Sequence, residues 1–165
     1  MRRVLSIVLL AIALLGSSLM LTSANADHQN YRESSYRGGD SFRLLAVSDQ
    51  FEEIDVGRRG FSIGDYVAFN DKLYFRRSRV GTLDGTCVVT RLHRRDEGAQ
   101  QCVVTLTLPR GHLTAQGLLT FEGDEPDPFT VAITGGTGRY SNAAGEAHVR
   151  ILNEDRTLID IDLEN

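Results

Sequence analysis

The sequence predicts an all-β domain, and two observations carry that prediction. From Phe42 onward, short segments rich in Val, Ile, Leu, Thr and Phe recur about every 8–14 residues, separated by Gly, Asp, Asn or Pro. Several of them alternate strictly: in 157–163 (TLIDIDL) the two Ile and the last Leu share one face, while both Asp share the other. Because no segment keeps a helical repeat over three turns, the strands must form a sandwich or a closed barrel.

Candidate strands can be assigned in chain order, each ending where turn residues begin. The pair Asn70–Asp71 predicts a turn between two of them, because both side chains favour turns. The segments are 42–48 (FRLLAVS), 65–69 (DYVAF), 72–77 (KLYFRR), 86–93 (TCVVTRLH), 101–108 (QCVVTLTL), 112–121 (HLTAQGLLTF), 129–134 (FTVAIT), 146–152 (EAHVRIL) and 157–163. They make eight or nine strands.

The chain before these strands has a different character. Two arginines precede the apolar run 4–15, and Ala24-Asn25-Ala26 supplies a small-residue cleavage site, so 1–26 is predicted to be a signal peptide cut after Ala26. An uncleaved anchor is the alternative, although the run is short for a bilayer span. Residues 27–41 lack apolar periodicity and predict a flexible arm. We therefore expect a secreted domain over 42–165, with no stable membrane insertion.

Charge and cysteine content narrow the classes of partner. The net charge is −4, and no basic run interleaves with aromatic residues, which argues against nucleic acid as a partner. Cys87 and Cys102 are the only cysteines, and in an exported protein two cysteines usually pair. A disulfide is the prediction, and a free Cys87 thiol facing a pocket is the alternative. Together with scattered histidines, two cysteines do not predict a metal site.

The glycine-rich stretch 132–146 (AITGGTGRYSNAAGE) is either a phosphate-binding loop or a connector between strands. A phosphate loop needs a helix after it, whose N-terminal amides bind the anion. Here an alternating strand pattern follows, and the Lys-Ser/Thr pair of nucleotide-binding loops is absent. The stretch is therefore predicted to be a connector in which Gly135, Gly136 and Gly138 allow positive φ angles and tight turning.

As a connector, this stretch resembles the hallmark turn of plant allene oxide cyclases and dirigent proteins, which are eight-stranded antiparallel barrels with an apolar lumen. Three further segments resemble the cyclases in the same order: 63–75 (IGDYVAFNDKLYF), 85–89 (GTCVV) and 111–117 (GHLTAQG). The resemblance covers most of the predicted domain. It implies an eight-stranded antiparallel β-barrel of the allene oxide cyclase-like or dirigent-like type.

The resemblance also implies a catalytic set. Allene oxide cyclases close an unstable fatty-acid epoxide into a cyclopentenone without a metal or cofactor, by positioning and electrostatics in a dry cavity. Glu53 stands at the position of the family's catalytic Glu, and Asp55 and Asp71 replace two Asn that hold a water. Three carboxylates in one cavity should raise the pKa of at least one of them, through repulsion and burial.

The resemblance further implies a ligand-binding wall made of Val67, Phe69, Cys87 and Leu119, the last replacing a pocket Tyr of the plant enzymes. The function it implies is a cofactor-free isomerase or cyclase that acts on an apolar, oxygenated, lipid-like substrate. A dirigent-like or lipocalin-like protein that holds a hydrophobic ligand without catalysis is the alternative. A homotrimer follows from the same resemblance. The arginines of 76–79 are a solvated edge or a basic rim that would suit a carboxylate-bearing ligand.

Overall fold

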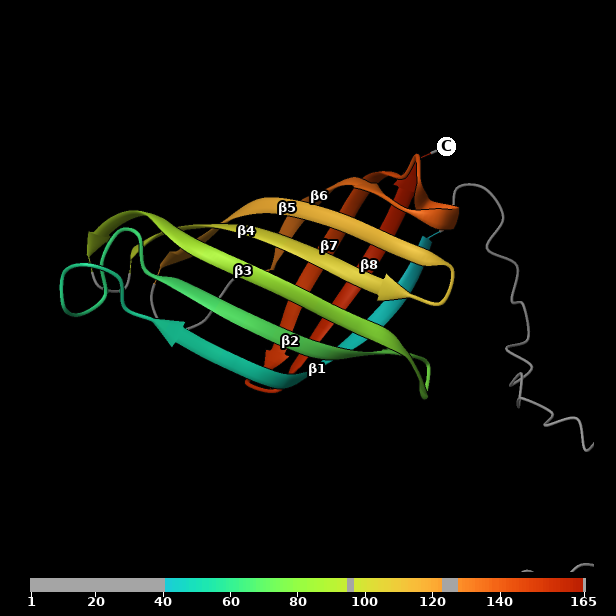
Figure 1. The fold of residues 1–165 in the computed structure, drawn as a ribbon, viewed down its shortest axis with the longest axis horizontal. Helices are drawn as coiled ribbons and strands as arrows, with labels where there is room; N and C mark the ends of the chain where they lie inside the picture. The colour runs from blue at the N-terminus through green and yellow to red at the C-terminus, as the bar shows by residue number, and fades with distance from the viewer. Residues whose placement is uncertain (1–40, 95–96, 123–127, 165) are drawn as a thin grey trace, which may run out of the picture. The chain divides into compact units, whose positions relative to one another are not determined.

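The computed structural model of the protein describes residues 41–94, 97–122 and 128–164, which form a closed barrel of eight antiparallel strands (Figure 1). Each strand pairs with its neighbours in the chain, and the last pairs back with the first. The strands are β1 (Ser41–Ile54), β2 (Tyr66–Phe75), β3 (Ser78–Arg94), β4 (Glu97–Leu108), β5 (Gly111–Glu122), β6 (Phe129–Gly136), β7 (Ala144–Asn153) and β8 (Arg156–Glu164). The prediction of an all-β, eight-stranded barrel is confirmed.

The predicted signal peptide, and all of the predicted arm except its last residue, lie outside the described residues. Within the described part of the chain there is no helix with the length and apolar character needed to cross a bilayer.

The turn predicted at Asn70–Asp71 is wrong, because both residues lie in the middle of β2. Inward and outward side chains alternate through the pair, and the Asn70 amide donates to Asp84 on β3 (Nδ2–Oδ1 2.6 Å). Two predicted strands therefore fuse into one. The chain turns instead after β2, at Arg76, whose φ is 57°.

The hydrophobic core fills one end of the barrel. Leu73, Leu113 and Ile161 are completely buried there, and the glycine-rich connector closes this end. The connector joins β6 to β7 through a single 3₁₀ turn, η1 (Gly138–Tyr140), as predicted for a strand connector and not for a phosphate loop. Gly138 has a φ of 62°, and a Cβ on it would lie 2.5 Å from the Arg110 carbonyl oxygen.

The other end of the barrel is open on one side. Pairing between β1 and β8 stops at Val47 and Arg156, yet β1 continues to Ile54. Seven residues at about 3.3 Å each extend it by about 23 Å. The pairing of β5 with β6 likewise stops at Gln116, well before β5 ends. The first five strands therefore run on past β7 and β8 as an open sheet, which is visible in Figure 1.

Candidate active site in the barrel lumen

A β-bulge in β1 decides which of its side chains enter the lumen. Before the bulge, Ala46 and Ser48 face inward, and the pairing with β2 then skips one residue between Ser48 and Gln50. The extra residue, Asp49, binds Lys72 on the outer face. Because one inserted residue reverses the alternation, Phe51 and Glu53 face the lumen beyond it.

The lumen contains a cavity of about 390 Å³, a size typical of small-molecule sites. It is lined mainly by apolar side chains from all eight strands, and it reaches the open end. Strand pairing arranges the wall in successive rows across β1–β4. The row nearest the open end holds Glu53, Val67, Cys87 and Cys102; the next holds Phe51, Phe69, Gly85 and Val104; the third holds Ser48, Asp71, Leu83 and Leu106.

Gly85 shapes this wall through the absence of a side chain. A Cβ at this position would lie 2.5 Å from Cζ of Phe69 and 2.7 Å from Cγ1 of Val104. The Phe69 ring occupies the space that a larger residue would need. The glycine of the GTCVV segment is therefore a packing requirement of the lumen.

The predicted ligand-binding residues all line the cavity: Val67, Phe69, Cys87 and Leu119. Cys87 and Cys102 face each other across β3 and β4 and form a disulfide in the wall. The predicted pairing is confirmed, and the alternative of a free Cys87 thiol is wrong.

Of the three predicted carboxylates, the lumen brings together two. Glu53 is exposed at the mouth, and Asp71 is partly buried deeper in the same cavity. Asp55 lies outside it, beside a smaller neighbouring pocket, because the chain leaves β1 at Ile54. Its Oδ2 accepts the Gly60 amide (2.9 Å) and orders the loop 55–65. The catalytic roles of all three stay predictions.

The spacing of Glu53 and Asp71 limits what they can do together. Glu53 is paired with Val67, which precedes Asp71 by four residues on β2, or about 13 Å along the strand. A single water joins two oxygens that are about 5.6 Å apart, twice the usual hydrogen-bond length. This backbone spacing favours an elongated ligand that contacts both residues over a single water shared between them.

The pKa of Asp71 is raised above its usual value, first by burial and second by repulsion from Asp84. The predicted rise of one carboxyl pKa is confirmed in direction. The repelling group, however, is the exposed Asp84 of the neighbouring strand, which no pattern in the sequence indicated.

Asp65 is a structural carboxylate that sequence reasoning missed. It is buried, and its carboxylate accepts the amides of Val56 (2.8 Å) and Ser62 (2.6 Å), which tie the loop 55–65 together. The hydrogen bond from Val56 is the main cause of its lowered pKa. The same loop places Phe61 against Phe121 of β5, with ring centroids 6.0 Å apart. The loop thus reaches across the open end of the sheet.

Glu154 and Asp155 at the turn between β7 and β8 were also missed, and both line the cavity. The carbonyl of Asp155 accepts the Ser48 amide (2.9 Å), which holds this turn against the β1 bulge. The available signal was topological: in a barrel that runs up and down, the turns after β1, β3, β5 and β7 meet at one end.

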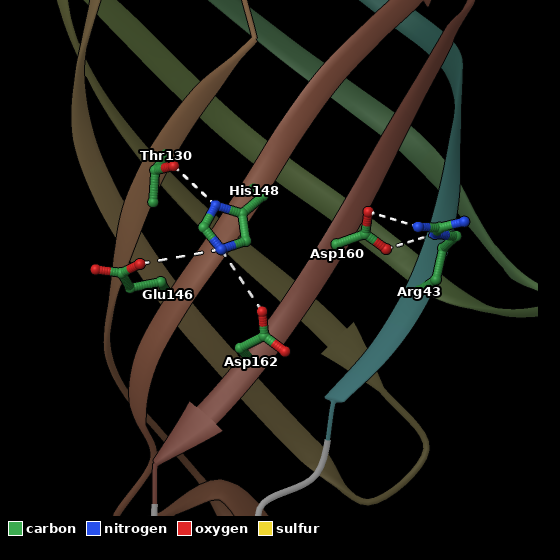
Figure 2. A network of polar contacts seen from close by, with 6 residues as sticks. All are labelled: Arg43, Thr130, Glu146, His148, Asp160 and Asp162. Atoms are coloured by element: carbon green, nitrogen blue, oxygen red, sulfur yellow. Dashed lines mark hydrogen bonds and ion pairs between the residues drawn. The ribbon is translucent and has the colours of Figure 1, made fainter.

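Charged side chains on the outer face of β1 and β6–β8 form a separate network (Figure 2). The ring of His148 contacts Thr130 (Nδ1–Oγ1 2.8 Å) and approaches Asp162 (Nε2–Oδ2 3.6 Å). Arg43 binds Asp160 through two hydrogen bonds, and the bond to Arg43 is the main cause of the lowered Asp160 pKa. No group of three potential metal ligands occurs among the residues that the structure describes.

The arginines proposed as a basic rim are also remote from the mouth. Arg76 and Arg77 form the turn between β2 and β3, and Arg79 follows at the start of β3. This turn lies at the closed end of the barrel, opposite the loop 55–65 (Figure 1). A basic rim around the mouth is therefore wrong for these residues.

Comparisons with known proteins agree with this architecture. A pyocyanin demethylase of known structure is 31% identical, with 74% of this chain and 98% of that chain covered and a TM-score of 0.64. An exo-specific intermolecular Diels-Alderase (16% identity, 74% and 96% covered, TM-score 0.56) shares the fold. So does a pterocarpan synthase dirigent protein (19% identity, 74% and 85% covered, TM-score 0.53). No curated protein matches the chain.

The family pattern of the allene oxide cyclase barrel like domain matches residues 45–163, nearly the whole barrel. The resemblance of the four sequence segments, the closed eight-stranded topology and this match agree with one another. The chain belongs to the allene oxide cyclase barrel-like family.

Proposed function

We propose that the protein is a cofactor-free enzyme that converts an apolar, oxygenated small molecule inside its lumen, by isomerisation or ring closure. The observation that carries the proposal is that Glu53 and Asp71 line the same, largely apolar cavity. The wall holds the guest, and Glu53 and Asp71 contact it from rows whose backbones lie about 13 Å apart.

The two carboxyl groups suit opposite halves of a proton transfer. Asp71 keeps its proton to a higher pH than an ordinary aspartate, because burial and Asp84 disfavour its ionised form. It can donate that proton to an oxygen of the guest. Glu53, exposed at the mouth, takes a proton from the guest, so the guest is rearranged with no net gain or loss of atoms.

A dirigent-like or lipocalin-like carrier is the alternative, since the same cavity could hold a ligand without changing it. The likeness to a pyocyanin demethylase at 31% identity supports an enzyme over a carrier. It also makes demethylation of a small molecule the second candidate reaction.

Binding can be tested with the neutral fluorescent probe N-phenyl-1-naphthylamine, whose emission rises in apolar surroundings. Leu119 lines the cavity, whereas its neighbour Leu118 is 48% exposed and points outward. We expect Leu119→Trp to abolish probe binding and Leu118→Trp to preserve it. Equal binding by both variants would contradict a lumenal site.

Catalysis can be tested on any compound that native mass spectrometry finds bound to the purified protein. Glu52 precedes Glu53 on β1 but faces outward, which makes Glu52→Gln the matched control for Glu53→Gln. Loss of a proton-transfer group typically costs about 10²–10⁴-fold in rate. If the protein is an enzyme, Glu53→Gln should lose turnover but keep binding, while Glu52→Gln keeps both. If it is a carrier, neither the wild type nor either variant shows turnover.

A further inference from the structure

We propose that the lumen selects neutral or cationic apolar molecules and rejects those that carry a carboxylate; the inference rests on the proposed function of the lumen as a ligand site. It concerns the charge of the guest. The substrate of the plant cyclases that the sequence resembles is a fatty-acid epoxide, which carries a carboxylate and is therefore anionic.

The charge of the cavity wall is entirely of one sign. The acidic residues Glu53, Asp71, Glu154 and Asp155 are part of the lining. Among the residues that the structure describes, no lysine, arginine or histidine lines the cavity. A ligand carboxylate that entered would find no cation to pair with.

The basic groups nearest in the sequence do not line the cavity. Lys72 follows Asp71 but faces outward and binds Asp49. Arg58 and Arg59 are exposed on the loop 55–65 and line neither the lumen nor the smaller pocket beside it. On the opposite face of the wall, Arg43 is bound to Asp160.

These acidic residues act in a wall whose other lining residues are mostly apolar. A cavity lined by one sign of charge and low-dielectric side chains focuses its field on whatever enters. An anionic guest would lose its hydration and be repelled by the acidic residues, whereas a cationic guest would exchange hydration for a carboxylate partner.

Aromatic faces in the same wall add an independent preference. Phe51 and Phe69 occupy the row between Glu53 and Asp71, and Phe129 also lines the cavity. The negative faces of such rings attract a positively charged or electron-poor flat molecule. Aromatic rings between two carboxylates favour a planar guest whose positive charge is delocalised.

Three compounds that share one skeleton test the inference: 2-phenylquinoline, the 1-methyl-2-phenylquinolinium cation and 2-phenylquinoline-4-carboxylate. Each competes with N-phenyl-1-naphthylamine at pH 7.5 and low ionic strength. We expect the carboxylate to bind at least about tenfold more weakly than the cation, with a difference that shrinks as salt is added.

Matched variants assign the selectivity to the lumen. Asp71→Asn and Glu53→Gln should each narrow the ratio of cation affinity to carboxylate affinity, and the two substitutions together should remove most of it. Each should change the affinity for neutral 2-phenylquinoline by less than about twofold. Glu52→Gln, on the outer face, should leave the gap unchanged. Circular dichroism confirms folding, and the exposed Glu53 keeps the test decisive if Asp71→Asn misfolds.

The outcomes separate this inference from the proposed function. If the probe binds and the carboxylate competes as well as the cation, the charge selection is refuted while the lumenal site stands. Charge selection by the lumen is likewise refuted if a variant that lacks both Glu53 and Asp71 still prefers the cation to the carboxylate. If the wild-type protein binds neither the probe nor any of the three compounds, the lumenal site fails and this inference fails with it.

Discussion

The disulfide between Cys87 and Cys102 gives a prediction whose size follows from the structure. The two residues are 15 apart in the chain and join β3 to β4 across the cavity wall. Closing a loop of that length in the unfolded chain lowers its entropy enough to stabilise the folded state by about 3 kcal/mol at 25 °C. For a barrel of this size, that free energy corresponds to about 10 °C in Tm.

The assay is thermal unfolding followed by circular dichroism, with and without a reducing agent, after thiol titration has confirmed complete reduction. The double variant Cys87→Ala/Cys102→Ala has no bond to break, and its Tm should not respond to the reductant. A fall of less than about 2 °C on complete reduction would refute the estimate. Two free thiols in the native protein would refute the pairing itself.

Four further outcomes are expected. The pKa of Asp71 is raised in the folded state, so the stability of the wild type falls as pH rises through that pKa. Asp71→Asn should therefore be more stable than the wild type at neutral pH and lose that advantage in acid. If urea unfolding gives wild type and variant the same dependence of stability on pH, this expectation is contradicted. The pKa of Asp65 is lowered in the folded state, so its carboxylate stabilises the wild type at neutral pH, and this stability is lost as acid protonates it. Asp65→Asn should therefore be less stable than the wild type at pH 7. A variant as stable as the wild type at pH 7 would contradict this. Gly138→Ala should lower the free energy of unfolding in urea by at least about 3 kcal/mol. Gly57 also has a positive φ, but nothing lies within 4 Å of a new Cβ there, so Gly57→Ala should cost only about 1–2 kcal/mol. Equal losses in the two variants would contradict the crowding at Gly138. Finally, if the predicted signal peptide is cut, the mature protein should begin at Asp27, and the family resemblance predicts the mass of a trimer. N-terminal sequencing and light scattering test the two expectations, which an intact leader or a monomer would contradict.

Much of the fold could be predicted because apolar alternation and turn residues act locally. The strand pattern of 157–163 and the glycine connector appear in the structure as expected. The wall residues Val67, Phe69 and Leu119 line the lumen as the family resemblance implied. The failure at Asn70–Asp71 has a tertiary cause, since a side-chain hydrogen bond to Asp84 and pairing on both edges override a local turn preference.

The candidate site could be predicted only in part, because it depends on register and on distant chain segments. Strict alternation from Ala46 would point Glu53 outward, and only the extra residue at Asp49 turns it into the lumen. Glu154 and Asp155 reach the cavity because the β7–β8 turn packs on that same bulge. Neither effect has a signature within a single strand.

The most direct measurement of the central claim, that the lumen is the functional site, is a crystal structure of the protein with N-phenyl-1-naphthylamine bound. We expect probe density inside the barrel, against Phe69 and between the rows that hold Glu53 and Asp71. Density confined to the outer surface, for example over the exposed Val103, with the lumen occupied only by water, would contradict it.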